Sequence, residues 1–337
     1  MNSFERVQHR LRDEPVDRPP NFNIFMASAA RHVGQSLRDF YLDYRVFCEA
    51  NLAVQCDFSL DVLSTMSDPY RETADWGAVI EFPDDDLPKS KEPLLQSLSD
   101  IHRLKSPDPD TGGRMSDRVN AVRYYREQAG GLVPIMGWVE GALAETADLR
   151  GVSTLMVDLH DQPEAVEEVL ERCTESAIAF ARAQIKAGAD IIGLGDAVAS
   201  QISPKMYQRF ALPYEQRIFS AVRQMGALTR LHICGNISKL LPYVAQTGAD
   251  IVDIDWMVDF GAARQICSNS AVCGNFDPVA VMLQGTPETV RQAVTRALDL
   301  GGPRCFSMAG CEIPQGTPRT NLEAHTQTLR DYGNREK

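Results

Sequence analysis

Short apolar runs alternate with longer segments of helical periodicity along most of the chain. In the longer segments, apolar side chains recur every three or four residues, which places them on one face of a helix. Pro163–Ala187 is the clearest example, with Val166, Val169, Leu170 and Cys173 on one face and acidic residues in its first turns, where the helix dipole favours them. The short apolar runs have the length of strands that are buried on both faces, as in a parallel sheet.

Two modules repeat the same order of a helix, the triplet Gly-Ala-Asp and an apolar run. The triplet precedes the run 191–194 in one module and the run 251–254 in the other. Glycine is suited to ending a helix because it adopts left-handed backbone angles without strain. Repeated helix and strand units of this kind predict parallel strands joined by helices.

The pattern predicts an α/β fold with eight strands. The expected strands are 23–28, 57–63, 132–138, 191–194, 228–233, 251–254, 272–276 and 304–309. The expected helices are 3–12, 37–54, 116–130, 163–187, 207–226, 237–247, 260–268 and 286–300. Eight alternating units favour a single (β/α)8 TIM barrel spanning residues 1–337, preceded by an N-terminal extension. An open dinucleotide-binding sheet is disfavoured because no GxGxxG turn follows an early strand.

The segment 67–117 interrupts this order. It is rich in Asp, Pro and Lys, and its helical and strand patterns are weak. Long segments of this kind in compact proteins are usually functional lids or disordered. We interpret it as a long excursion over the mouth of the barrel, with a solvated insertion that has no role as the alternative.

The charge of the chain is acidic, with 34 Lys and Arg against 46 Asp and Glu and a net charge of -12. Nucleic acid is therefore not expected as a main partner, because phosphate binding needs a basic face. No apolar run approaches the roughly 18 residues of a membrane span and no signal-peptide core is present, so a cytoplasmic protein without a membrane partner is expected. The eight cysteines are scattered and do not resemble a secreted disulfide framework.

Polar and sulfur-containing side chains collect where the predicted strands end. The active site of a TIM barrel is built at the carboxyl ends of its strands. The candidates at these ends are Met26, Ser64, Trp138, Glu140, Asp196, His232, Cys234, Asp255, Asn275, Asp277, Cys311 and Glu312. From this set we expect substrate contacts from Met26, Trp138, Glu140, Asp196 and Asn275.

His232, Cys234 and Cys311 are the candidate metal ligands. Residues i and i+2 of a strand point the same way, so His232 and Cys234 can reach one ion, and imidazole and thiolate are ligands that zinc prefers. Three protein ligands would leave a fourth position for substrate. The alternatives are a nucleophilic Cys311, a redox pair of Cys234 and Cys311, or three residues that are merely packed.

The sequence resembles the uroporphyrinogen decarboxylase superfamily and, within it, the branch of cobalamin-dependent methyltransferases. The likeness covers most of the chain and includes EPVDRPP, IMGWVEGAL, GADIIGLGD, LHICGN, GNFDP and AGCEIPQGTPRTN. Its most specific element is HIC at 232–234 paired with GCEIP around Cys311, which matches the His-x-Cys…Cys zinc motif of that branch.

This resemblance implies a zinc site in which a thiol substrate is bound and attacks the methyl group of a methylated corrinoid. A carboxylate that leaves when substrate arrives is expected as the fourth ligand, with Asp255 as first candidate and Glu312 as second. The corrinoid (cobalamin) is expected on a separate carrier protein, because no DxHxxG cobalamin motif is present and His160 lacks the glycine context. The carrier would dock on the segment 67–117. A homodimer is expected by analogy with the decarboxylases.

Three other functions stay open. A corrinoid-loading methyltransferase of the O-demethylase type would use a methoxy donor in place of a thiol acceptor. A metal-independent decarboxylase is disfavoured because the segment NFNIFMASAARHVGQS lacks the arginine-rich substrate motif of those enzymes and has only Arg31 and His32 in its place. A non-catalytic zinc or corrinoid binding module is the third alternative.

Overall fold

Seven parallel strands form one curled sheet with the order β1-β4-β5-β6-β7-β8-β9. The computed structural model describes residues 1–111 and 113–335. The strands of the sheet are β1 (Leu63–Ser64), β4 (Ile135–Glu140), β5 (Ile191–Gly195), β6 (Leu228–His232), β7 (Ile251–Ile254), β8 (Ala271–Phe276) and β9 (Cys305–Ala309). Two further strands, β2 (Ile80–Glu81) and β3 (Lys89–Ser90), pair antiparallel outside it. The expected parallel α/β arrangement is confirmed.

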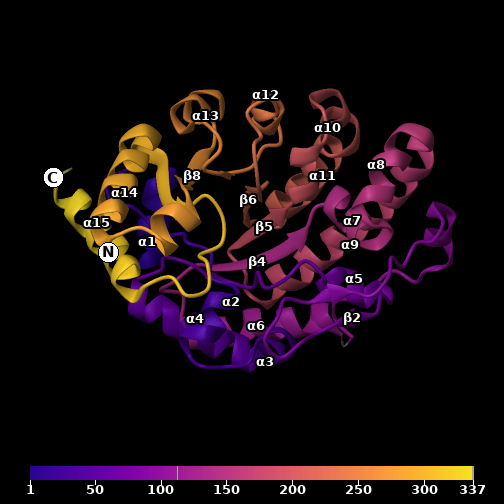
Figure 1. The fold of residues 1–337 in the computed structure, drawn as a ribbon, viewed down its shortest axis with the longest axis horizontal. Helices are drawn as coiled ribbons and strands as arrows, with labels where there is room; N and C mark the ends of the chain where they lie inside the picture. Colours follow the sequence, from indigo (N-terminus) through magenta and orange to yellow (C-terminus); the bar gives the residue numbers. More distant parts are fainter. Residues whose placement is uncertain (112, 336–337) are drawn as a thin grey trace.

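Helices surround the curled sheet, with α13 and α14 next to β8 and α4 and α6 on the opposite side of the ring (Figure 1). The α-helices are α1 (Ser3–Leu11), α2 (Ala27–His32), α3 (Leu37–Leu42), α4 (Tyr44–Phe58), α5 (Arg71–Trp76), α6 (Arg114–Ala129), α7 (Ala142–Arg150), α8 (Val152–Asp161), α9 (Pro163–Ala187), α10 (Pro204–Phe210), α11 (Leu212–Gln224), α12 (Leu241–Val244), α13 (Phe260–Ile266), α14 (Pro287–Gly301) and α15 (Arg319–Arg335). Shorter helical turns are η1 (Leu98–Arg103), η2 (Ala197–Gln201), η3 (Pro278–Leu283) and η4 (Gly302–Arg304). None of the helices in the described ranges combines the length and apolarity that a bilayer crossing requires.

The two faces of the sheet bury different cores. In β5, Ile191 belongs to the core inside the curl and Ile192 to the larger core between sheet and helices. In β6, Leu231 belongs to the outer core, so Arg230 and His232, one residue to either side, point into the curl. This alternation directs His232 toward the interior at the carboxyl end of β6.

The predicted strand 23–28 is wrong. Its second half begins α2, and residues 20–23 are extended without forming a strand. This extended segment nevertheless lies between the two edges of the sheet: Ser307 N donates to Pro20 O, Phe22 N donates to Ser307 O and Asp61 N donates to Asn21 O, each at 2.9 Å. Proline has no amide hydrogen and cannot donate to a ladder, which explains part of the irregularity. The eighth position of the ring is therefore filled by irregular backbone.

The predicted strand 57–63 is also wrong, apart from its last residue. Helix α4 continues to Phe58 and ends at Ser59, whose backbone is left-handed. Asp61 follows, fully buried, and accepts hydrogen bonds from two arginine side chains and one backbone amide. A buried carboxylate needs such partners. Of the predicted strand, only Leu63 pairs with β4, as the first residue of β1.

The segment 67–117 contains more structure than its sequence indicates. It includes α5, the β2 and β3 hairpin and η1. Asp75 accepts hydrogen bonds from the backbone amides of Arg114 and Met115, which joins α5 to the start of α6. The sequence also does not predict α7, α8 or α15. The predicted helix 207–226 is divided into α10 and α11, because Ala211 leaves helical geometry just before Pro213.

Candidate metal centre

Three donor atoms from two strand ends meet inside the curl. His232 ends β6, Cys234 follows two residues later, and Cys311 follows β9. His232 Nε2 lies 3.0 Å from Cys234 Sγ and 3.8 Å from Cys311 Sγ, and the two sulfur atoms are 3.5 Å apart. Among the described residues this is the only group of His, Cys, Asp and Glu donors close enough to share one ion. The structure therefore brings together the three ligands expected from the sequence.

The donor set fits zinc in kind and in spacing. Zinc binds sulfur at about 2.3 Å and imidazole nitrogen at about 2.0–2.1 Å with tetrahedral angles, so its ligands lie roughly 3.5–3.8 Å from one another. Two of the three separations lie at these values, and the His232–Cys234 separation of 3.0 Å needs only a small widening. All three side chains are buried or half-buried.

The two thiols differ in acidity. The pKa of Cys311 is lowered because Cys234 donates a hydrogen bond to it and His232 lies close by, although burial opposes the shift. The pKa of Cys234 is raised by the same hydrogen bond and by burial. Cys311 is thus the first thiolate of the pair, and thiolates are the form of cysteine that binds metal.

Asp253 and Arg230, which are not among the site residues expected from the sequence, support the side of the His232 ring that faces away from the donors. His232 Nδ1 lies 2.8 Å from Asp253 in β7, and Asp253 also accepts from Arg230 Nε at 2.9 and 3.0 Å. With a carboxylate beside Nδ1, the ring proton resides there and Nε2 is left to bind a metal. The sequence contains one indication of these residues. Arg230 and Asp253 are charged residues inside predicted buried strands, and each lies two positions before a candidate site residue, His232 or Asp255.

Asp255 is near the donors without belonging to the group. Its Oδ2 accepts a hydrogen bond of 2.7 Å from Gly235 N, next to Cys234. Its Oδ1 is buried without a hydrogen-bond partner, and a methyl carbon placed on Gly310 would lie 3.1 Å from that oxygen. Asp255 therefore holds the loop that carries Cys234, and its unpartnered oxygen lies beside Gly310, the residue before Cys311.

Glu312 makes a contact with α2 instead. Its Oε1 accepts a hydrogen bond of 3.0 Å from Ala27 N at the start of α2, whose N-cap is Met26. Burial and the neighbouring Cys311 raise the pKa of Glu312 to about 7. Met26 is half-buried and packs against the core inside the curl.

Trp138 and Glu140 face the same side as the metal donors. The rings of Trp138 and His232 have centroids 6.3 Å apart. Strand pairing aligns Glu140 with Gly195 and Gly195 with His232. Residues aligned across a parallel sheet point to the same side, so Trp138 and Glu140 face the side of the sheet that carries the donors. Their contact with a substrate stays a prediction.

Asp196 and Asn275 have other neighbours. Asp196 is fully buried and accepts from Ala144 N at 2.9 Å, and Glu215 interacts with its carboxyl group. Asn275 donates to Val258 O at 2.9 Å and thereby holds the loop after β7. Their contacts are those of residues that position the backbone around the centre.

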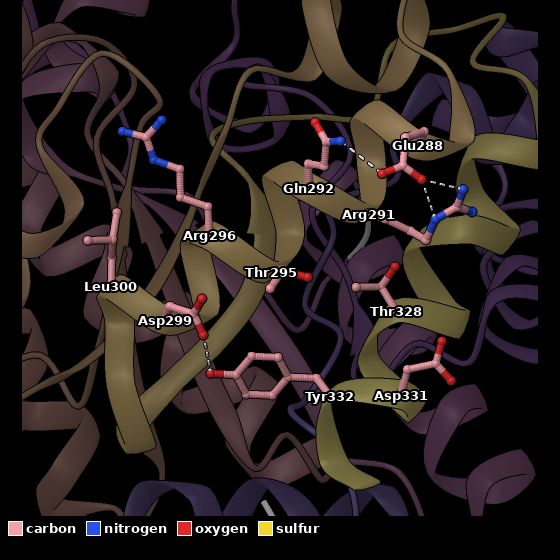
Figure 2. Close-up of a pocket in the computed structure, with 10 residues that line it drawn as sticks. All are labelled: Glu288, Arg291, Gln292, Thr295, Arg296, Asp299, Leu300, Thr328, Asp331 and Tyr332. Carbon is pink, nitrogen blue, oxygen red and sulfur yellow. Dashed lines mark hydrogen bonds and ion pairs between the residues drawn. The ribbon is translucent and has the colours of Figure 1, made fainter. Parts of the chain in front are cut away.

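A hollow elsewhere on the molecule is lined by no histidine or cysteine of the described residues. This space of about 650 Å³ lies between α14 and α15. Figure 2 shows its lining, in which Arg291 and Gln292 donate to Glu288, and Tyr332 donates to Asp299. The acidic groups drawn there already have partners, including Asp331, which accepts a hydrogen bond of 2.8 Å from Gln327. None of the three candidate metal ligands lines this hollow.

The parallel strands and the side chains at their carboxyl ends place the chain among the α/β barrel-like proteins with a site at that end. A sequence model of the uroporphyrinogen decarboxylase (URO-D) family matches residues 2–332. The chain belongs to the URO-D family, and this expectation is confirmed.

Relatives in this family have two kinds of name. The chain is 28% identical over 334 residues to the methylcobamide:CoM methyltransferase MtbA of Methanosarcina mazei, covering 97% of each chain. It is 29% identical over 345 residues to the uroporphyrinogen decarboxylase of Prochlorococcus marinus, covering 96% of this chain and 95% of the relative. A solved methyltransferase from Methanosarcina mazei has the same fold, with a TM-score of 0.86, 23% identity and coverage of 98% and 99%.

Proposed function

We propose that this protein is a zinc-dependent methyltransferase that moves a methyl group between a corrinoid, carried by a partner protein, and a thiol. The observation that carries the proposal is the meeting of His232, Cys234 and Cys311 within 3.8 Å of one another. The relatives named methylcobamide:CoM methyltransferase support the corrinoid as the other substrate.

In this proposal the chain holds the metal and leaves one position for substrate. Zinc lowers the pKa of a coordinated thiol, so that the thiol is held as thiolate at neutral pH. Asp253 keeps His232 Nε2 directed at the ion, while Asp255, through Gly235, fixes the loop that carries Cys234. Asp255 remains the candidate for a carboxylate that coordinates before substrate arrives, because its Oδ1 is unpartnered, with Glu312 as the second candidate.

In the direction of thiol methylation the carbon–cobalt bond breaks and a carbon–sulfur bond forms, leaving the corrinoid as cob(I)amide. The reverse kind of reaction, loading a corrinoid from a methoxy donor, uses the same centre. Two cysteine ligands favour a thiol substrate, because their charge reduces the Lewis acidity that a methoxy donor needs. Decarboxylation without metal is the other candidate, since named decarboxylases are among the relatives.

The partner protein and a second copy of the chain are the proposed macromolecular contacts. The corrinoid must approach the carboxyl end of the sheet, where the donors lie. We therefore keep the segment 67–117 as the proposed docking element of the carrier, and a homodimer as the proposed assembly.

Metal analysis tests the centre first. We expect one zinc per chain in the wild-type protein and strong loss of zinc in His232→Ala and Cys311→Ala. Cys56→Ala, at an exposed position of α4, is the matched control and should keep its zinc. Full zinc content in both site variants would overturn the metal centre.

Methyl transfer tests the reaction. Wild-type protein with methylcobalamin and a thiol should consume the methyl–cobalt absorbance, and a chelator should stop this without unfolding the protein. Porphyrinogen decarboxylation that continues after complete chelation would support the competing function instead.

A further inference from the structure

The two sulfur atoms of the candidate metal centre lie close enough to react with each other. Cys234 Sγ and Cys311 Sγ are 3.5 Å apart. The sulfur–sulfur bond of a disulfide is about 2.05 Å long, so the two atoms need to approach by roughly 1.5 Å. Small rotations of the two side chains can supply this approach without moving a strand of the sheet.

Both cysteines lie where a small solute can reach them. Each follows the end of its strand by two residues, Cys234 after β6 and Cys311 after β9, so neither belongs to the strand ladder. Both side chains are half-buried. A short separation and partial exposure are the two conditions that a pair of thiols needs to form a disulfide with a dissolved oxidant.

The other six cysteines lie in different surroundings. Cys56 is exposed on α4, and the remaining five are buried, namely Cys48, Cys173, Cys267, Cys273 and Cys305. Buried thiols in apolar surroundings are inert toward dissolved oxidants. Oxidation that joins two cysteines is therefore expected first at the candidate metal centre.

A disulfide between these cysteines and a bound zinc ion exclude each other. Zinc binds cysteine as a thiolate, and a sulfur atom in a disulfide is no longer a thiolate. Of the three described donors that can share one ion, only His232 would remain as a ligand. Zinc in turn occupies both sulfur atoms and keeps them from reacting with each other.

Resting on the proposed function, we propose that Cys234 and Cys311 are also a site of reversible oxidation: without zinc, a peroxide joins them in a disulfide, which blocks metal binding until a thiol reduces it. One cysteine sulfur attacks hydrogen peroxide, so a sulfur–oxygen bond forms and the oxygen–oxygen bond breaks. The leaving hydroxide takes the thiol proton and departs as water. The second cysteine sulfur then attacks the sulfenic sulfur and releases another water. Two thiols are oxidised and one peroxide is reduced.

The return step is thiol–disulfide exchange. An external thiol attacks one sulfur of the disulfide and forms a mixed disulfide, and a second external thiol then releases the protein sulfur. Two external thiols become one external disulfide, and both cysteines regain their hydrogen atoms. A thiol acceptor of the proposed methyl transfer has the chemistry for this step, so the substrate of the centre can also restore the centre.

Mass spectrometry of the full-length protein tests the disulfide without turnover. Zinc-loaded and chelator-treated samples receive the same dose of hydrogen peroxide, their remaining thiols are blocked, and trypsin digests them. In the chelated sample we expect the peptides 231–239 and 305–319 to be linked, and 2-mercaptoethanol should separate them. In the zinc-loaded sample both peptides should stay unlinked.

Two variants identify the cysteine in the second peptide, which contains both Cys305 and Cys311. Cys305 belongs to the core between the sheet and the helices and has no exposed surface. Cys305→Ala should therefore keep the link, and Cys311→Ser should lose it. Oxidised wild-type protein should also lose its zinc binding and regain it after reduction. A link that persists in Cys311→Ser would overturn the assignment.

The outcomes separate this inference from the function on which it rests. If the chelated protein forms no link, or the link forms equally fast with zinc bound, the inference is overturned, and methyl transfer by the zinc protein would still support the function. If the link forms in a protein that never takes up zinc, the proposed function is wrong and the oxidation of the pair stands.

Discussion

Asp253 links the interior of the sheet to the metal centre. Its carboxylate is buried between Arg230 and His232, and both contacts are shorter than 3.1 Å. The pKa of Asp253 is lowered: burial opposes the shift, but Arg230 and His232 outweigh it. A permanently ionised carboxylate in this place sets the orientation of the imidazole, which a metal ligand requires.

Asp253→Asn should weaken zinc binding by about 10- to 100-fold, the usual effect of removing a supporting hydrogen bond behind a metal ligand. Competition with a chromophoric chelator measures the affinity. Asp331→Asn, on the exposed side of α15, is the control and should match wild type. Unchanged affinity in Asp253→Asn would show that His232 needs no support from this carboxylate.

The residue-level predictions succeeded where strand geometry determines the outcome. His232 and Cys234 were paired because alternate residues of a strand share a side, and the structure agrees. Cys311 joined them because it follows another predicted strand of the same barrel, whose strand ends converge, and the family motif supported the set of three. Asp253 was not predicted because the apolar pattern marks the run 251–254 as a buried strand and does not indicate a role for the one polar residue within it.

At the scale of elements, the loop between β6 and α12 determines where Cys234 lies. Gly235 has a φ of +91°, which places it in the left-handed region that favours glycine. Its amide is held by Asp255, so the turn and the side chain of the next strand position Cys234 together.

Gly235→Ala should therefore lower zinc affinity as well as stability. The left-handed backbone costs about 1–2 kcal/mol for a non-glycine residue, and the added carbon would lie 3.3 Å from Ser200 Oγ. Gly226→Ala is the matched control, because its φ is +87° and nothing lies within 4 Å. Urea unfolding should show similar losses in both, and zinc titration a loss in Gly235→Ala alone. Equal zinc affinity in the two variants would contradict this role of the turn.

Element prediction failed where polar contacts replace a strand ladder. The runs 23–28 and 57–63 are apolar enough for strands, yet α2 begins within the first and α4 ends within the second. Asp61 and Asn21 supply the hydrogen bonds that join these segments. Such long-range polar pairing leaves no periodic signal in the sequence.

At the scale of the whole molecule, α15 completes the ring by covering the junction between β9 and the irregular segment 20–23. His325 of α15 is 1% exposed and shares a 2.9 Å hydrogen bond with Ser307 of β9. Burial lowers the pKa of His325 to about 3, with a smaller contribution from Arg18. The parallel α/β plan of this assembly was predictable from repeated modules, whereas α15 was not expected.

Acid should destabilise this assembly through His325. Below the ordinary pKa of about 6.5 the unfolded chain binds a proton that the folded chain excludes, so stability falls as pH falls from 6.5 toward 3. His325→Gln should reduce the dependence of unfolding free energy on pH by about 1.4 kcal/mol per unit between pH 6 and pH 4. Urea unfolding at several pH values measures it. Identical slopes for wild type and variant would mean that His325 is charged in the folded protein.

The central claim is that His232, Cys234 and Cys311 hold zinc with a position for a thiol substrate. X-ray absorption at the zinc edge tests it most directly. We predict two sulfur neighbours at about 2.3 Å in the protein alone and three after addition of a thiol acceptor. A sulfur count that stays at two with saturating thiol, or zinc coordinated without sulfur, would contradict the account.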